Sequence, residues 1–273
     1  EVVHGLAFAT AQSADPAGAT PSAFRIGDSV FESGGFGNYS LTATGRAIGT
    51  GSVDSQQPLT LRSDSRIAPR MDVFVLKAGY QVTASGAVLA DLSDAATLPD
   101  FQRPAANVSI AVASNKNVTP ESAGTLLMET GAEVNTDAGG SVTFSASTPI
   151  QIDGRINAPA GSITVRELKP STDLGYDPAA GIFVGPDAVL SVAGTTLLRP
   201  SDIGLRQGEV RDGGVIRLTA DRGVIDLAPG SRLDVSGTQA TLDLLSGSSS
   251  AGASPYESRL VASAGGSIEL LAR

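Results

Sequence analysis

Three aspartates, Asp153, Asp226 and Asp234, are the residues whose type and spacing could support catalysis in this chain. Each falls in a turn or at an alternating position of a short predicted strand, so they could line one face of a repeated β structure. Acid/base cleavage of a glycosidic bond needs two carboxylates held roughly 5 to 10 Å apart. A carbohydrate-active enzyme, either a polysaccharide lyase or a glycoside hydrolase, is therefore the alternative function.

Other features of the sequence weigh against that chemistry. The chain has no Asp-Asp pair, no tryptophan and only four tyrosines that could stack against sugar rings. Its single histidine, His4, lies near the start and belongs to no Gly-His-Gly element. The G-x-S-x-G motif is absent, and His4 is the sole candidate base for a serine nucleophile. We therefore expect no enzyme and assign no catalytic residue.

Metal and cofactor sites are not predicted either. There is no cysteine, and the segment from Gly34 to Asn38 starts like a calcium-binding glycine repeat but places Asn where a carboxylate is needed. Asp91 with Asp94, and Asp221 with Asp226, are interpreted as solvated turn caps. The phosphate-binding pattern G-x-x-x-x-G-K-[ST] does not occur.

The charge balance excludes further partners. Lysine and arginine total 19 against 28 acidic residues, and the net charge of -9 repels phosphate backbones, so no nucleic acid is expected. Arg62, Arg66 and Arg70 are spaced four apart, but Pro69 and the turn Ser63 to Ser65 place them on loops or outward strand positions. No stretch approaches the roughly 18 consecutive apolar residues of a membrane span, so membrane insertion is not expected.

Three Asn-x-Ser/Thr sequons begin at Asn38, Asn107 and Asn117. They would accept glycans if the source organism glycosylates such proteins, but chance explains them better in a chain rich in serine and threonine. The absence of cysteine suits a protein that crosses membranes unfolded, because a premature disulfide would block its passage.

A repeat organises the chain. The pairs Gly139-Gly140, Gly213-Gly214 and Gly265-Gly266 each open a similar run, GGSVTFSA, GGVIRLTA and GGSIELLA. Apolar residues then alternate with polar ones, which is the pattern of short strands. In the first copy the apolar positions are Val142, Phe144, Ala146, Ile150, Ile152, Ile156 and Ala158. We expect each glycine pair at a corner that needs positive φ or close approach of the next backbone.

The repeat predicts an all-β fold, a right-handed single-stranded parallel β-helix with extra-helical loops or small hairpin or helix insertions. Turns of two to four residues cannot bring an antiparallel ladder back to the same edge repeatedly, whereas a coil of three strands closes naturally. Weaker copies of the strand pattern run from Tyr39 to Thr44, Leu59 to Leu61, Val73 to Ala78, Val82 to Leu89, Val108 to Val112, Leu126 to Val134, Ile163 to Val165 and Val189 to Val192.

The domain organisation follows from this pattern. Residues 1–33 are an irregular lead-in or a first incomplete coil, and residues 34–273 form the β-helix. The strand rhythm is interrupted near 91–106, 168–181, 196–212 and 238–264, and the last insertion could hold a short helix or hairpin around Thr241 to Leu245. Because Ser267 to Leu271 is predicted as an uncapped strand, we expect the native chain to continue with more coils.

The strings GGSVTFSAST, IQIDGRINAPAGSITV, GGVIRLTADRGVIDLAPGSRLDVSG and GGSIELLA resemble coils of the filamentous-haemagglutinin family of large exoproteins, the passengers of two-partner secretion. The resemblance covers roughly Gly34 to Arg273. The family's amino-terminal secretion domain usually carries Asn-Pro motifs, and this chain has no Asn-Pro dipeptide. We therefore expect it to lie downstream of such a domain.

The resemblance implies a role as the structural shaft of a secreted or surface-exposed bacterial adhesin. It implies export across the outer membrane through a dedicated transporter barrel, which is the partner that we expect. Adhesion, aggregation or display of a distal effector domain would follow, with a receptor on a host or bacterial surface. We expect a monomer without a cofactor.

Overall fold

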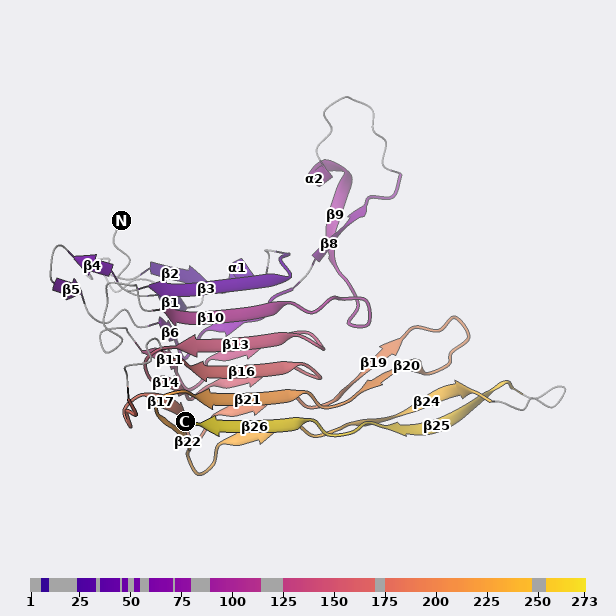
Figure 1. Ribbon diagram of the computed structural model, residues 1–273. Helices are drawn as coiled ribbons and strands as arrows, with labels where there is room; N and C mark the ends of the chain where they lie inside the picture. The colour runs from indigo at the N-terminus through magenta and orange to yellow at the C-terminus, as the bar shows by residue number, and fades with distance from the viewer. Residues whose placement is uncertain are drawn as a thin grey trace.

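The computed structural model describes residues 6–9, 24–32, 35–44, 46–48, 52–54, 59–70, 72–79, 89–113, 125–169, 175–246 and 254–273. These residues form an all-β protein in which three of the seven sheets are parallel and the others are two-stranded and antiparallel (Figure 1). Two helices of one turn, α1 (Ser29–Glu32) and α2 (Leu89–Leu92), are also present.

The three parallel sheets run the length of the structure. The seven-stranded sheet has the order β2-β1-β6-β11-β14-β17-β22, the six-stranded sheet β26-β21-β16-β13-β10-β3, and the five-stranded sheet β23-β18-β15-β12-β7. The seven-stranded sheet contains β1 (Leu6–Ala9), β2 (Phe24–Gly27), β6 (Leu59–Leu61), β11 (Leu126–Met128), β14 (Ile150–Ile152), β17 (Gly181–Val184) and β22 (Val224–Leu227). The six-stranded sheet contains β3 (Asn38–Thr44), β10 (Asn107–Ala113), β13 (Ser141–Ala146), β16 (Ser162–Glu167), β21 (Val215–Ala220) and β26 (Ser267–Ala272). The five-stranded sheet contains β7 (Arg66–Ile67), β12 (Glu133–Asn135), β15 (Arg155–Asn157), β18 (Val189–Ser191) and β23 (Arg232–Asp234).

The chain visits these sheets in rotation. From β11 onward it passes through the seven-stranded, the five-stranded and the six-stranded sheet and then begins again, and we call one such passage a round. Each strand pairs in parallel with its counterpart in the next round, as β13 does with β16. The backbone of each round is thereby hydrogen-bonded to the rounds on either side, with strands roughly 4.8 Å apart.

The core consists of the inward residues of successive rounds, stacked in register. Ile110, Phe144, Val165 and Leu218 are partners along the six-stranded sheet, and all four are fully buried. The predicted alternation is confirmed in the first repeat, where every apolar position named above is buried. In the second repeat Ile216 and Leu218 are buried, while Ile225, Leu227, Leu233 and Val235 are partly buried.

The predicted role of the glycine pairs is confirmed at the corner between the five-stranded and six-stranded sheets. Gly139 has a φ of 90°. The second glycine of each later pair lies against the backbone of the preceding round. A Cβ on Gly214 would lie 1.8 Å from the carbonyl oxygen of Gly161, and one on Gly266 would lie 1.8 Å from that of Gly214. No side chain fits at this point, because the backbones of neighbouring rounds touch there.

We call the rounds formed by the three parallel sheets the stack. The antiparallel sheets are hairpins outside it. They are β4 (Arg46–Ile48) with β5 (Ser52–Asp54), β8 (Asp72–Leu76) with β9 (Ser93–Thr97), β19 (Thr195–Arg199) with β20 (Gln207–Arg211), and β24 (Gln239–Leu245) with β25 (Tyr256–Ala262). The last two lie at the stretches 196–212 and 238–264 that interrupt the strand rhythm. Residues 241–245 are strand and not helix.

The strand prediction for Val73 to Ala78 is wrong in its partner. Residues 72–76 leave the stack and pair antiparallel with residues 93–97, so this insertion starts well before residue 91. On this hairpin Phe74, Val75 and Leu76 are 63%, 51% and 45% exposed. The prediction failed because an alternating pattern indicates a strand but not the strand with which it pairs. Residues 82–88 lie outside the described residues, and Leu89 begins α2.

The lead-in also takes part in the stack. Strands β1 and β2 from residues 1–33 pair in parallel with each other, and β1 pairs with β6. They extend the seven-stranded sheet at the N-terminal end of the molecule (Figure 1).

Candidate functional site

The three aspartates considered for glycan cleavage are not brought together. Asp226 lies on β22 of the seven-stranded sheet, Asp234 on β23 of the five-stranded sheet, and Asp153 in the turn after β14. Asp153 accepts a hydrogen bond from Gln151, at 2.7 Å. The backbone N–H of Ser236, together with the nearby Arg232, lowers the pKa of Asp234, which favours a charged surface group.

Most of the other predicted residues occupy the surface. Arg62, Arg66 and Arg70 are exposed on loops or an outward strand position, as predicted. Asp91 and Asp94 are not turn caps: Asp91 lies in α2, and Asp94 lies on β9, 3.7 Å from the Lys77 ammonium. His4, Gly34 and Asn117 lie outside the described residues.

Two of the three sequons stack on each other. Asn107 on β10 donates its side-chain amide to the Asn38 side chain on β3 at 3.0 Å, and its own oxygen accepts from Ser141 at 2.7 Å. These residues form a polar ladder across three rounds on the outside of the six-stranded sheet. Their place in the ladder gives both asparagines a structural role.

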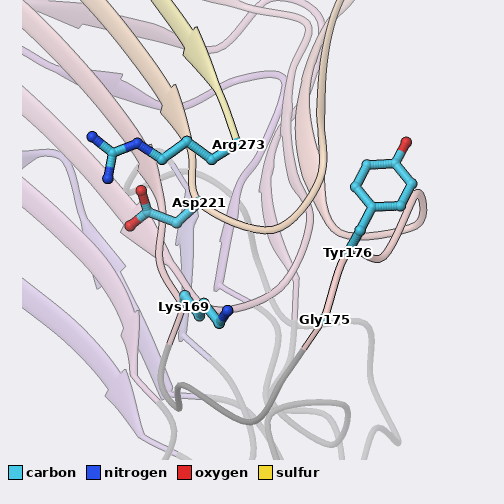
Figure 2. Close-up of a pocket in the computed structure, with 5 residues that line it drawn as sticks. All are labelled: Lys169, Gly175, Tyr176, Asp221 and Arg273. Carbon is cyan, nitrogen blue, oxygen red and sulfur yellow. The ribbon is translucent and has the colours of Figure 1, made fainter.

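A pocket opens where the strands of the six-stranded sheet end. Lys169, Gly175, Tyr176, Asp221 and Arg273 line it (Figure 2). Asp221 and Arg273 directly follow the paired residues Ala220 and Ala272, so they lie on neighbouring rounds. From the sequence, only the predicted insertion at 168–181 pointed to this pocket, and Asp221 was interpreted as a turn cap.

Next to this pocket, Glu167 is a buried carboxyl group on the inward side of β16. One of its oxygens accepts the backbone N–H of Arg222 at 2.8 Å, and the other has no hydrogen-bond partner among the described residues. Loss of water around the group raises its pKa above the ordinary 4.5. Removing one partly satisfied charge from the interior is therefore expected to help folding at neutral pH.

We predict that Glu167→Gln makes stability less dependent on pH. A folded-state pKa above the unfolded value means that the folded chain binds the extra proton, so the native protein loses stability as pH rises through that pKa. The variant should match the native chain at acid pH and be more stable at neutral pH, as urea midpoints measured across pH would show. Glu209→Gln is the control with opposite sign, because Arg211 lowers the pKa of Glu209. Equal pH profiles for the native chain and Glu167→Gln would contradict the prediction.

A second candidate site lies at the corner where hairpins leave the stack. The connections after β7, β18 and β23, which all lead from the five-stranded to the six-stranded sheet, carry the hairpins β8–β9, β19–β20 and β24–β25. In Figure 1 all three hairpins leave the stack at its right-hand edge; β19–β20 and β24–β25 extend to the right, and β8–β9 extends upward. A groove lined by Pro99, Asp100, Phe101, Thr196, Leu197, Leu198, Arg199 and Pro200 separates the loop after β9 from β19.

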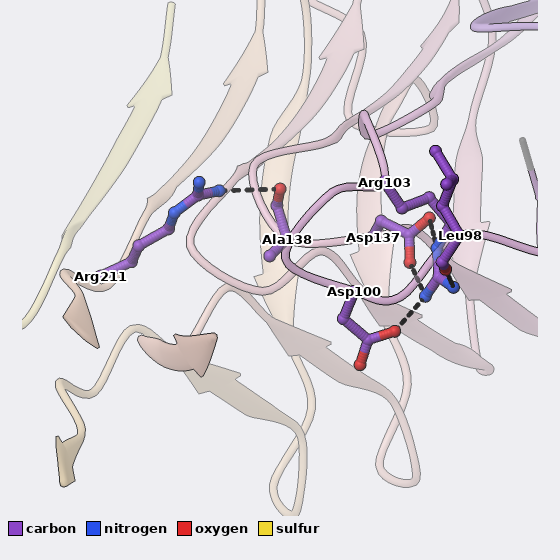
Figure 3. A network of polar contacts seen from close by, with 6 residues as sticks. All are labelled: Leu98, Asp100, Arg103, Asp137, Ala138 and Arg211. Atoms are coloured by element: carbon purple, nitrogen blue, oxygen red, sulfur yellow. Dashed lines mark hydrogen bonds and ion pairs between the residues drawn. The ribbon is translucent and has the colours of Figure 1, made fainter. Parts of the chain in front are cut away.

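One turn of the stack holds both walls of this groove (Figure 3). Arg103, from the loop after β9, makes two hydrogen bonds of 2.7 Å to the Asp137 carboxylate, and its side chain is only 15% exposed. Arg211, at the end of β20, donates to the Ala138 carbonyl at 3.1 Å. The hydrogen bonds to Asp137 raise the pKa of Arg103. Sequence reasoning missed these residues, because Arg103 and Asp137 are 34 positions apart.

We predict that Arg103→Ala releases the loop at residues 98–106 without unfolding the stack. Loss of a bidentate, largely buried ion pair should cost about 2 to 3 kcal/mol, although the loop can relax into water. Hydrogen exchange should become faster in residues 98–106 and remain slow in β13 and β16. Arg199→Ala removes an exposed arginine of the same groove and is the control. Unchanged exchange in the Arg103 variant would argue against the clamp.

Together, these features define a class of protein: an all-β stack of parallel sheets with hairpins set on one corner and polar groups scattered over its surface. Comparisons with protein-family models, with curated proteins and with solved structures found no match to this chain. Within the described part of the chain, no cluster of three or more His, Cys, Asp or Glu residues could hold a metal ion. In the same part, neither helix has the length and apolar character needed to cross a membrane.

Proposed function

We propose that this chain is a non-enzymatic shaft segment of a bacterial exoprotein of the filamentous-haemagglutinin type, folded as a right-handed single-stranded parallel β-helix. The observation that carries the proposal is the strict rotation of the chain through three parallel sheets, round after round, in one register. Parallel connections within a sheet are almost always right-handed, which supports the hand. Repetition of this kind builds length more readily than it builds a catalytic cleft.

The outer surface supports a shaft as well. Ser40, Ser109, Thr143 and Thr164 are register partners along the outside of the six-stranded sheet, so small hydroxyl side chains cover four consecutive strands. The interior is a narrow column of aliphatic residues with a single deeply buried phenylalanine on these strands, Phe144. A surface and core of this kind suit a fibre that is exported through an outer-membrane transporter barrel and then displays binding elements or a distal effector domain.

The test is the location of the protein on its source cells. Antibodies raised against residues 1–273 should label intact cells or the culture medium, and protease added to intact cells should remove the label. Deleting the gene for a neighbouring outer-membrane transporter should retain the protein inside the cell. Labelling that requires lysis of wild-type cells would refute surface display, and export that persists without the transporter would refute the two-partner route.

A further inference from the structure

The groove beside β19 presents the edge of a strand. Among the described strands β19 pairs with β20 alone. On the other side of this hairpin β20 lies against β24, where Asp243 donates its backbone N–H to the Arg206 carbonyl at 2.8 Å. Consecutive residues from 196 to 200 line the groove. A strand that turned one face to the groove would contribute alternate residues, so the groove runs along the edge of β19 and its main-chain polar groups.

The two walls of the groove are anchored on adjacent residues of one turn. Arg103 of the far wall bonds to the Asp137 carboxylate at 2.7 Å. Arg211, the partner of Thr195 at the base of β19, donates to the Ala138 carbonyl at 3.1 Å. Figure 3 shows the two arginines reaching the turn from opposite sides. The separation of the walls is therefore set by the stack and not by free loops.

The space at the base of the walls suits an extended chain. The far wall leads into β10 and β20 leads into β21, and β13 and β16 lie between these strands in the six-stranded sheet. The connections into β13 and β16, 136–140 and 158–161, are short corners without a hairpin. The gap therefore exceeds the roughly 4.8 Å that one added strand needs beside β19. Both walls belong to stretches that the structure describes without a gap, 89–113 and 175–246.

Apolar side chains line both walls. Leu198 on β19 is 55% exposed, and Phe101 and Pro99 line the opposite wall. That wall is a closed turn, because the Pro99 carbonyl accepts the N–H of Gln102 at 2.9 Å. An extended segment paired with β19 would thus pack its side chains against a fixed apolar surface.

The free charge of the groove is positive. The Asp100 carboxylate is bonded to Arg103 at 2.6 Å, and Glu209 on β20 is bonded to Arg211 at 2.7 Å. Arg199, at the end of β19, has no carboxylate within ion-pair distance among the described residues, which include the whole of its hairpin. A segment with a single acidic side chain is therefore complementary to the groove.

We propose that this groove binds an extended peptide segment of a partner protein as an added strand on β19. The peptide main chain pairs with the edge of β19, apolar side chains pack between Leu198 and Phe101, and one acidic side chain binds Arg199. Pro200 has no N–H and ends the ladder, so the segment is short. The proposal rests on the proposed shaft function only for its biological use. Because binding is measured on the purified chain, a failed titration and a failed cell-labelling experiment are distinguishable.

The experiment titrates the purified chain with the blocked peptide Thr-Val-Glu-Val-Thr, whose alternation suits a strand. Two further peptides carry N-methyl groups on one or the other alternate set of main-chain amides. We expect one methylated form to lose binding at least about tenfold and the other to bind like the parent, because only one edge of the peptide pairs with β19. Lysine in place of the glutamate should weaken binding several-fold. Equal binding by both methylated forms would overturn strand addition, as would no binding of the parent peptide.

Variants assign the binding to this groove. Phe101→Ala should weaken peptide binding about tenfold and Arg199→Gln several-fold, with circular dichroism unchanged. Arg103→Ala, which releases the far wall, should also weaken it. Leu260→Ala removes a leucine that is 64% exposed on β25, outside the groove, and should have no effect. Full binding by Phe101→Ala and Arg199→Gln would overturn the assignment.

Hydrogen exchange locates the added strand. The bound peptide should slow amide exchange in β19 and leave β25 unchanged. Slowing in β22, β23 or β26, the last strands of the three parallel sheets, in place of β19 would overturn the site. Sedimentation of the free chain tests the other occupant, a second copy. A dimer that the peptide dissociates would show that the groove pairs with another copy and would overturn the assignment to a partner protein.

Discussion

Gly214→Val is expected to lower the free energy of unfolding by more than about 3 kcal/mol. A Cβ at this position would lie 1.8 Å from the Gly161 carbonyl oxygen. The backbone cannot move aside, because Val215 donates to the Gly161 carbonyl and Ser267 donates to the Gly214 carbonyl, each at 3.0 Å. Urea denaturation followed by circular dichroism would measure the loss.

Gly175→Val is the matched control for this prediction. A Cβ on Gly175 meets nothing within 4 Å. The free energy of unfolding of this variant, measured by urea denaturation, should therefore change by less than about 0.5 kcal/mol. If Gly214→Val fails to accumulate as folded protein, Gly214→Ala provides the smaller perturbation at the same point. A Gly214→Ala variant as stable as Gly175→Ala would show that neighbouring rounds are not in contact at this corner.

Phe144→Ala is expected to cost about 3 to 5 kcal/mol, because it removes the ring from the centre of the core. Phe144 is fully buried on β13, and its register partners on the two sides are Ile110 and Val165. The stacked strands on either side prevent the core from collapsing around the cavity. The melting temperature and the urea midpoint should both fall, while the urea m-value should stay nearly unchanged.

Phe74→Ala controls for the loss of an aromatic ring as such. Phe74 is 63% exposed on the β8–β9 hairpin, outside the stack, so its removal should cost less than about 1 kcal/mol. Similar losses for Phe144 and Phe74 would mean that the column of inward residues does not stabilise the fold.

The sequence predicted the stack well because burial in a strand is a local property. Val142, Phe144 and Ala146 alternate with polar residues, and that alternation alone decides which side chains turn inward. The glycine pairs were equally readable, since two adjacent glycines before a strand indicate a backbone that must pass another closely. These patterns were sufficient to predict an all-β fold with strands stacked in parallel.

Pairing partners and sites were harder to predict because they depend on contacts between distant residues. The alternation of residues 72–76 suits the stack and a hairpin equally, and only the three-dimensional structure shows the antiparallel choice. The ion pair of Arg103 with Asp137, and the grouping of Lys169 with Arg273, join residues that no local pattern connects. Asp153, Asp226 and Asp234 have similar local settings in the sequence, yet one lies in the turn after β14 and the other two lie on different sheets.

The corner that bears the hairpins acts as a ruler. At this corner the hairpin β8–β9 follows β7, and the hairpin β19–β20 follows β18. Strands β12 and β15 lie on the rounds between them, so the bases of these two hairpins are three strand spacings apart, about 14 Å. Gain or loss of a whole round between them would change this separation in steps of about 4.8 Å while leaving each arm intact. Distances between projecting arms can thus evolve in discrete increments, independently of the arms' own sequences.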